Sequence, residues 1–200
     1  MNLPNKLSLL RVFLVPIFMV FYLCNFGLGI WRFVIAAVIY MAAGFTDFLD
    51  GNIARKYGLV TNLGKFLDPL ADKFMVMTSL LCLCYMSAIN AVNGNDKIYG
   101  ACLVVASAIV IFRELAITSM RLVAASTDGS VIAAAYLGKL KTVTQMVFTS
   151  FAIIEPAFYG FGISFINNHV LSYVLMALMT IMTVWSGIDY LKSYWKYIKE

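Results

Sequence analysis

The chain has 200 residues, of which 62% are hydrophobic and 12% charged, and its formal net charge is +5. This apolar share is far above that of a soluble globular domain and is typical of a polytopic membrane protein. The four cysteines lie inside apolar runs without metal-site spacing to histidine, which argues against a disulfide framework or a zinc site. We therefore predict that residues 1–200 form a single all-α membrane domain.

Six apolar runs are candidates for transmembrane helices, each of which needs about 20 residues. In chain order they are Ser8–Phe26, Phe33–Leu49, Phe74–Ile89, Ile98–Ala116, Val143–Phe161 and Val170–Ile188. We expect several of these helices to extend beyond the bilayer. The first run contains Arg11 and is not followed by a small-residue cleavage site, so we interpret it as a span rather than a signal peptide.

The distribution of positive charge orients the predicted helices. When both termini are placed in the cytoplasm, only Arg32 and Lys97 of the 15 Lys and Arg residues fall on the opposite side. The positive-inside rule therefore predicts cytoplasmic termini. The last residues, Lys192–Glu200, mix cations with aromatic side chains and are typical of an interfacial anchor on anionic lipid.

Acidic residues gather between the second and third predicted spans. Asp47 and Asp50 are three residues apart, and Asp68 and Asp72 are four apart, so each pair shares one face of a helix. We expect one pair to end a span and the other to open the next, with a turn at Lys56–Leu63 between them. Carboxylates beside a membrane span are costly unless they have a partner or a function.

Four facing carboxylates indicate a divalent-cation site. Like charges at short range cannot all stay ionised without a cation. Hard oxygen ligands suit Mg²⁺, Mn²⁺ or Ca²⁺ rather than zinc, and two divalent ions would balance the four charges. The nearby Gly51, Ala54 and Gly64 lack bulk, so a large ligand can lie against the backbone there. Alternatively, the acids are only solvated or paired with neighbouring Lys and Arg.

The segment Asp47–Asp72 reads D-x2-D-G-x2-A-R-x8-G-x3-D-x3-D. It is similar at every fixed position to the signature of the CDP-alcohol phosphatidyltransferases, which are six-span membrane enzymes, usually homodimers, that release CMP from a CDP-linked donor. The resemblance implies that two Mg²⁺ or Mn²⁺ ions are bound by Asp47, Asp50, Asp68 and Asp72. It implies that Asp72 is also the general base on the acceptor hydroxyl.

The resemblance further implies a donor site shaped by Gly51, Ala54, Arg55 and Gly64. Metals bridging the donor phosphates would polarise phosphorus and stabilise the leaving CMP, and a neighbouring carboxylate can take the hydroxyl proton. Arg55 can add a bidentate phosphate contact. Asn5 is a candidate nucleotide contact, although Pro4-Asn5 can equally be only a helix start.

A second group of candidate residues is basic. We predict an acceptor-phosphate pocket beside the metals formed by Arg113, Arg121, Lys139 and Lys141. Glu114 and Arg121 share a helix face because they are seven residues apart. Two alternatives stay open: the lysines can simply mark cytoplasmic helix ends, and Glu114 can serve only to hold Arg113 in place.

Three segments resemble the branch of the family that uses sn-glycerol 3-phosphate as acceptor: Pro4–Arg11, Arg113–Arg121 and Gly138–Gln145. Ser8 and Met120 depart from that pattern, which often has Thr and Gly there. The predicted reaction transfers the phosphatidyl group of CDP-diacylglycerol to sn-glycerol 3-phosphate, giving phosphatidylglycerophosphate and CMP. We expect it at the cytoplasmic face of a bacterial cell (inner) membrane.

The sequence pattern leaves other functions open. The acceptor can be another molecule, such as inositol phosphate or serine. A divalent-cation or proton-coupled transporter would place acids along a pathway, but the acids gather near one face. A non-catalytic scaffold leaves the strict Asp spacing unexplained. The predicted partners are the two substrates, membrane lipids and a second copy of the chain; none is a nucleic acid.

Overall fold

The computed structural model describes residues 3–57, 62–92, 97–127, 136–163 and 169–198, without the side chains of 3–4, 47–57, 62, 65, 124–127 and 196–198. The described residues form helices α1 (Leu3–Leu23), α2 (Trp31–Tyr57), α3 (Asn62–Val92), α4 (Lys97–Thr127), α5 (Tyr136–Gly160) and α6 (Val170–Ile198). This confirms the predicted all-α fold with six helices. All six are longer than the predicted spans or extend beyond them, because their polar ends continue the helix.

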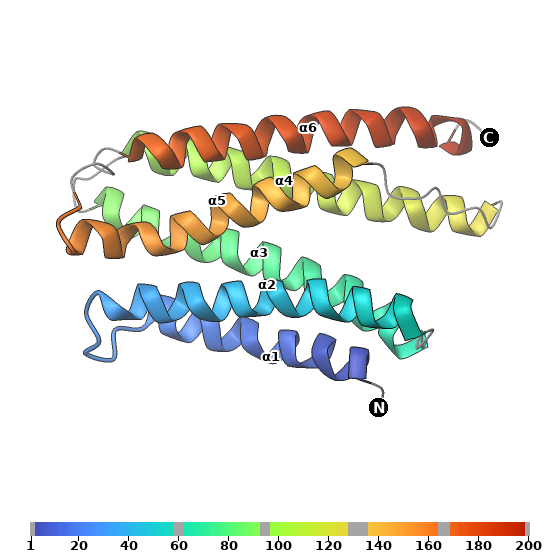
Figure 1. Ribbon diagram of the computed structural model, residues 1–200. Helices are drawn as coiled ribbons and strands as arrows, with labels where there is room; N and C mark the ends of the chain where they lie inside the picture. The colour runs from blue at the N-terminus through green and yellow to red at the C-terminus, as the bar shows by residue number, and fades with distance from the viewer. Residues whose placement is uncertain (1–2, 58–61, 93–96, 128–135, 164–168, 199–200) are drawn as a thin grey trace.

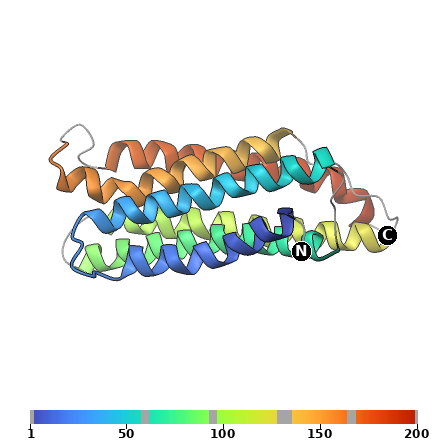
Figure 2. The same cartoon turned by 60° about the horizontal axis from the view of Figure 1, so that its bottom comes forward.

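The helices run up and down along one long axis (Figure 1). Each packs mainly against two neighbours, so that together they close a ring in the order α1, α2, α5, α6, α4, α3, with a smaller contact between α3 and α5. Figure 2 shows α5 beside α2, and α1 beside α3. Helices that follow one another in the chain are therefore not always neighbours. The beginning of α1 and the end of α6 lie at the same end of the bundle.

The helices have the character of membrane spans. Within the described residues, α1, α3, α4 and α6 contain segments long and apolar enough to cross a membrane. In α2 the apolar segment, Trp31–Thr46, is shorter than these. Helix α5 differs because it carries the buried polar residues Gln145, Thr149 and Glu155. Large side chains such as Phe112 are exposed on the outside, which suits contact with lipid. The chain is a polytopic helical membrane protein.

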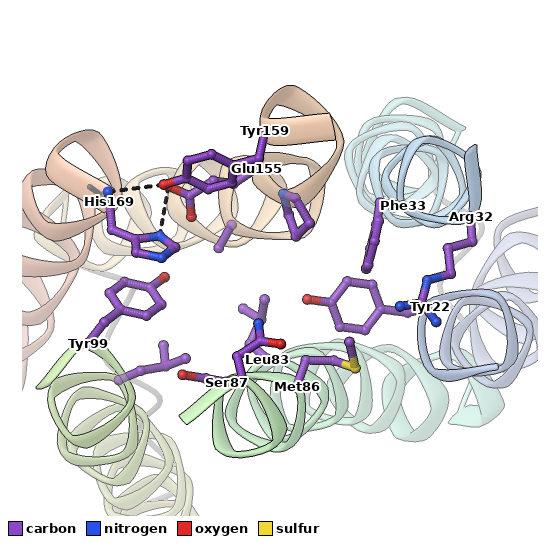
Figure 3. Close-up of a pocket in the computed structure, with 14 residues that line it drawn as sticks. Tyr22, Arg32, Phe33, Leu83, Met86, Ser87, Tyr99, Glu155, Tyr159 and His169 are labelled. Atoms are coloured by element: carbon purple, nitrogen blue, oxygen red, sulfur yellow. Dashed lines mark hydrogen bonds and ion pairs between the residues drawn. The ribbon is translucent and has the colours of Figure 1, made fainter. Parts of the chain in front are cut away.

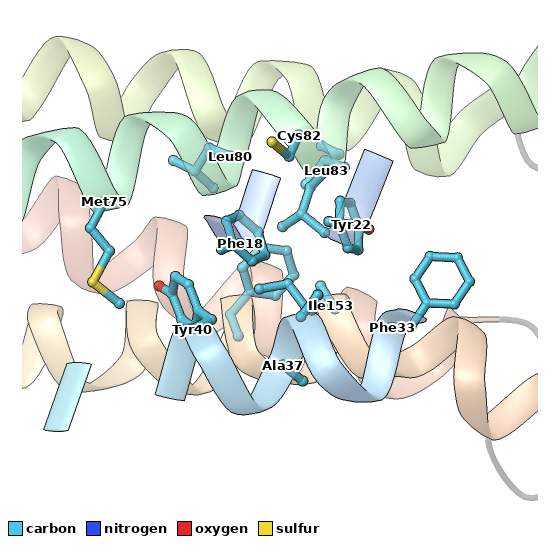
Figure 4. Packing of buried hydrophobic residues seen from close by; sticks show 14 of the residues in the cluster. Phe18, Tyr22, Phe33, Ala37, Tyr40, Met75, Leu80, Cys82, Leu83 and Ile153 are labelled. Carbon is cyan, nitrogen blue, oxygen red and sulfur yellow. The ribbon is translucent and has the colours of Figure 1, made fainter. Parts of the chain in front are cut away.

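Aromatic and small side chains form the centre of the bundle (Figure 4). Phe18 of α1 stacks on Tyr22 and lies 5.7 Å from the ring of Tyr40 in α2, measured between centroids. Ala36 and Ala37 are fully buried, so their small side chains let helix backbones approach closely. This packing fixes the ends of the helices, where the polar residues gather.

The Asp motif lies where the sequence predicts it, at the end of one helix and the beginning of the next. Its first half, residues 47–55, is in the last turns of α2, and its second half, residues 64–72, is in the first turns of α3. The connection is shorter than the predicted Lys56–Leu63 turn, because α2 continues to Tyr57 and α3 begins at Asn62.

Candidate active site

A cavity of about 510 Å³ lies at the end of the bundle where α3 and α5 begin and α4 and α6 end. Two of the predicted metal ligands, Asp68 and Asp72, line it. The same cavity is lined by all the predicted acceptor-phosphate residues, namely Arg113, Arg121, Lys139 and Lys141. Helices far apart in the sequence thus bring both predicted groups to one space.

Both carboxylates of α3 are held by α1. Asp68 Oδ1 accepts a hydrogen bond from the Ser8 hydroxyl, and Asp72 Oδ1 pairs with Nη1 of Arg11. The Arg11 side chain is fully buried, whereas that of Asp72 is 50% exposed. A buried cation therefore orients a carboxylate that stays accessible to a ligand.

Asn5, Ser8 and Arg11 form one polar face of α1. They recur at intervals of three residues, and all are buried. The sequence analysis included Asn5 as a site candidate but missed the other two. The regular polar spacing inside an apolar run was the available signal, since polar residues in a span turn toward the bundle.

Gly64, a predicted donor-site residue, is also buried, in the first turns of α3.

Glu114 connects α4 to α5 within the basic group. Its Oε1 accepts hydrogen bonds from Arg113 Nη1 at 3.0 Å and from Lys141 Nζ at 2.5 Å. Arg113 also donates to Ser186 Oγ on α6 at 2.7 Å. Glu114 therefore does hold Arg113, and it holds Lys141 as well, so two cations at the cavity are already fixed in position.

Tyr190 of α6 orders the remaining arginine. Arg121 Nη2 donates to the Tyr190 hydroxyl at 2.8 Å, and the guanidinium carbons of Arg113 and Arg121 lie 5.5 and 5.2 Å from the centroid of its ring. A Cβ at Gly138 would lie 3.3 Å from the Tyr190 hydroxyl, so the absence of a side chain lets α5 begin against this ring. Nothing in the sequence pattern indicated Tyr190.

Gln145 is a further site residue that spacing alone did not identify. It lines the cavity and is 2% exposed. Among the described residues, neither its amide oxygen nor its amide nitrogen has a hydrogen-bond partner. Buried amides are normally hydrogen-bonded, so this one is suited to bind a polar group of a ligand in the cavity.

The charge of the lining favours an anionic ligand. Among the described lining residues, the acids Asp68, Asp72 and Glu114 are outnumbered by cations, namely Lys73, Arg113, Arg121, Lys139 and Lys141. A cleft with one sign of charge raises the local concentration of ligands of the opposite sign. A phosphorylated substrate therefore fits the cavity better than a cation alone.

The described carboxylates suit a hard divalent cation, because Asp68 and Asp72 present only oxygen donors to the cavity. The other predicted metal ligands and most of the predicted donor site belong to α2, where the side chains lie outside the described residues: Asp47, Asp50, Gly51, Ala54 and Arg55. Within the described side chains, no group of three possible ligands is assembled.

The chain belongs to the CDP-alcohol phosphatidyltransferase family, whose family model matches residues 1–185. This agrees with the resemblance carried by the Asp motif.

Curated relatives over the full chain have the name CDP-diacylglycerol–glycerol-3-phosphate 3-phosphatidyltransferase. The relative from Bacillus subtilis (strain 168) is 36% identical, over 99% of this chain and 97% of its own length. The relative from Yersinia enterocolitica is 30% identical, over 100% of this chain and 98% of its own length. That from Pseudomonas fluorescens is 29% identical, over 100% and 93% respectively.

Proposed function

We propose that this chain transfers the phosphatidyl group of CDP-diacylglycerol to sn-glycerol 3-phosphate, giving phosphatidylglycerophosphate and CMP. The observation that carries the proposal is the single cavity in which Asp68 and Asp72 face the cations of α4 and α5. The relatives' name supports the same donor and acceptor. We propose one catalytic domain, residues 1–200.

Asp72 is the proposed general base. Arg11 holds one oxygen of its carboxylate, while the side chain remains half exposed to the cavity. A hydroxyl of the acceptor attacks the phosphatidyl phosphorus, and Asp72 takes the hydroxyl proton. The bond from phosphorus to the oxygen of CMP breaks, so CMP leaves with that electron pair.

The donor diphosphate belongs at the junction of α2 and α3. Asp47, Asp50, Asp68 and Asp72 would hold two Mg²⁺ or Mn²⁺ ions there, which neutralise the phosphates and stabilise the leaving CMP. We assign nucleotide and diphosphate contacts to Asn5, Gly51, Ala54, Arg55 and Gly64. The buried position of Asn5 and Gly64 near the same helix ends is compatible with this role.

The acceptor phosphate is assigned to the basic side of the cavity. Lys139 is exposed there and Arg121 is held by Tyr190, so both can donate to a phosphate without breaking an ion pair. Arg113 and Lys141 add charge from positions fixed by Glu114. The unpaired amide of Gln145 is left to bind a glycerol hydroxyl.

We propose that the cavity faces the cytoplasm in a bacterial inner membrane, because all Lys and Arg residues of the described helices except Arg32 and Lys97 lie in the half of the bundle that holds it. We also propose a homodimer. Light scattering of the detergent-solubilised protein tests the dimer, and cysteine labelling from one side of sealed vesicles tests the orientation. A mass equal to one chain plus detergent would contradict the dimer.

The test of the function uses purified protein in mixed micelles with CDP-diacylglycerol and Mg²⁺ or Mn²⁺. Release of CMP is followed with sn-glycerol 3-phosphate, inositol phosphate, inositol and serine in parallel. We expect release with sn-glycerol 3-phosphate alone. Release with a different acceptor would keep the metal site and reject the acceptor assignment, and no release from folded protein with any acceptor would reject the proposed reaction.

A further inference from the structure

A second polar cavity, of about 570 Å³, lies at the opposite end of the bundle. It is lined where α1, α3 and α5 end and where α2, α4 and α6 begin (Figure 3). It shares no lining residue with the Asp68 and Asp72 cavity, and the proposed transferase reaction gives it no role. A polar cavity between membrane helices is costly unless something occupies it.

One wall of this cavity carries a buried acid, and both of its oxygens have contacts within the same wall. The carboxylate of Glu155 is buried; its Oε1 lies 3.1 Å from His169 Nδ1, and its Oε2 accepts a hydrogen bond from Ser172 Oγ at 2.7 Å. The His169 ring stacks on Tyr99 at 4.4 Å between centroids, and its backbone N–H donates to the Tyr159 hydroxyl at 3.1 Å. Both carboxylate oxygens of Glu155 therefore already have a close contact within this wall.

The facing wall has donors without partners. Tyr22 is 2% exposed, and its hydroxyl makes no hydrogen bond within the described part of the chain. Figure 3 shows this hydroxyl directed toward the middle of the cavity. Arg32 also lines the cavity, with its guanidinium carbon 4.4 Å from the centroid of the Phe33 ring and no carboxylate partner among the described residues. Positive charge and an unused donor therefore face the same space.

We propose that this cavity binds the phosphate of an anionic phospholipid headgroup from the leaflet at this end of the bundle. Arg32 and the Tyr22 hydroxyl are the donors to the phosphate. Glu155 is already paired, so no carboxylate remains for the ammonium group of a zwitterionic lipid. Leu83, Met86 and Leu103 also line the cavity, and this apolar part suits the glycerol and first acyl carbons of a lipid better than a free ion.

The location agrees with a lipid ligand. Arg32 is in the first turn of α2, next to the exposed Trp31. Tryptophan and arginine at the end of a span are typical of the level of the lipid headgroups. A lipid bound here would join α1 and α2 to the rest of the ring at the end away from the proposed reaction.

The test is native mass spectrometry of the full chain released from micelles that contain equal amounts of dioleoylphosphatidylglycerol and dioleoylphosphatidylcholine. We expect the protein to retain a phosphatidylglycerol molecule that Arg32→Gln loses, with an affinity weaker by about tenfold. Tyr22→Phe removes only the hydroxyl and should weaken binding less. Lys97→Gln is the matched control, because it removes an exposed cation at the same end that does not line the cavity.

Two results would overturn the proposal. The first is equal retention of phosphatidylglycerol by Arg32→Gln and the unchanged protein, or equal retention of phosphatidylcholine and phosphatidylglycerol. The second comes from a thermal melt with inorganic phosphate as the probe. If phosphate stabilises the protein as much as phosphatidylglycerol does, and Arg32→Gln loses this stabilisation, the cavity is a site for a free anion instead. Release of CMP by Arg32→Gln reports that the variant is folded.

Discussion

The two polar cavities at opposite ends of the bundle use charge in different ways. In the described lining of the Asp68 and Asp72 cavity, cations outnumber acids, and the buried Gln145 amide has no described partner. At the other end, both oxygens of the buried acid Glu155 have contacts within its own wall, and Arg32 is the one Lys or Arg among the described lining residues. The first arrangement suits the binding and reaction of a highly charged substrate. The second suits stable binding of one anionic group without a reaction.

The difference shows which polar residues carry chemistry in a membrane bundle. A buried polar group that is fully paired contributes to structure, and one left incomplete is available to a ligand. By this criterion Glu155 is structural, although it is as deeply buried as Gln145 of the proposed active site. The predictions below separate the two ends.

Removal of divalent cations should have the largest effect. Treatment with EDTA is expected to reduce CMP release to background, because the donor phosphates and the Asp cluster would repel each other without a metal. Added Mg²⁺ or Mn²⁺ should restore activity. Turnover that persists after chelation and dialysis would show that the Asp end works without metals.

Replacing the proposed base comes next. Asp72→Asn should lower the rate of CMP release by about a thousandfold, in line with the loss of a general base. Asp189→Asn is the matched control and should keep its activity. Asp189 lies in the part of α6 at the same end of the bundle as Asp72, but it does not line the cavity. Full turnover by Asp72→Asn would rule out the assigned role.

Gln145→Leu should raise the KM for sn-glycerol 3-phosphate by about tenfold, through loss of a hydrogen bond to the acceptor. The KM for CDP-diacylglycerol should stay the same. The melting temperature without substrate should hold or rise, because the change removes a buried amide that has no described partner. A lower melting temperature with an unchanged KM would mean that Gln145 is structural.

At the other end, Glu155→Gln should act on stability alone. Loss of the charged partner of His169 and Ser172 is expected to cost about 1–3 kcal/mol. A thermal melt should therefore show a lower midpoint, while CMP release at a temperature well below it stays unchanged. A large loss of activity in folded protein would mean that the two ends are coupled.

Much of the fold and part of the site could be predicted from local sequence. Long apolar runs gave the helices, and the three- and four-residue spacing of Asp47, Asp50, Asp68 and Asp72 placed the motif at the end of α2 and the start of α3. Motif resemblance also selected Arg113, Arg121, Lys139 and Lys141, which the structure brings to one cavity. Their roles in binding stay predictions.

Contacts between helices could not be predicted in the same way. Arg11 was recognised as a charge inside a span, but its pairing with Asp72 depends on how α1 and α3 are rotated about their axes. The same holds for Tyr190, which meets Arg121 only because α6 packs beside α4 in the ring. Hydropathy reports which segments are helices, not which faces meet.

The sequence by itself therefore determined the helices, their apolar surface and the cluster of acids, since each depends on neighbours within a few turns of one chain segment. The tertiary structure decided which residues complete the site, and it revealed the second cavity with Tyr22 and Arg32 facing Glu155 and His169. These groups come from three helices and from the residue just before α6, and only the closed packing of the whole ring sets their distances.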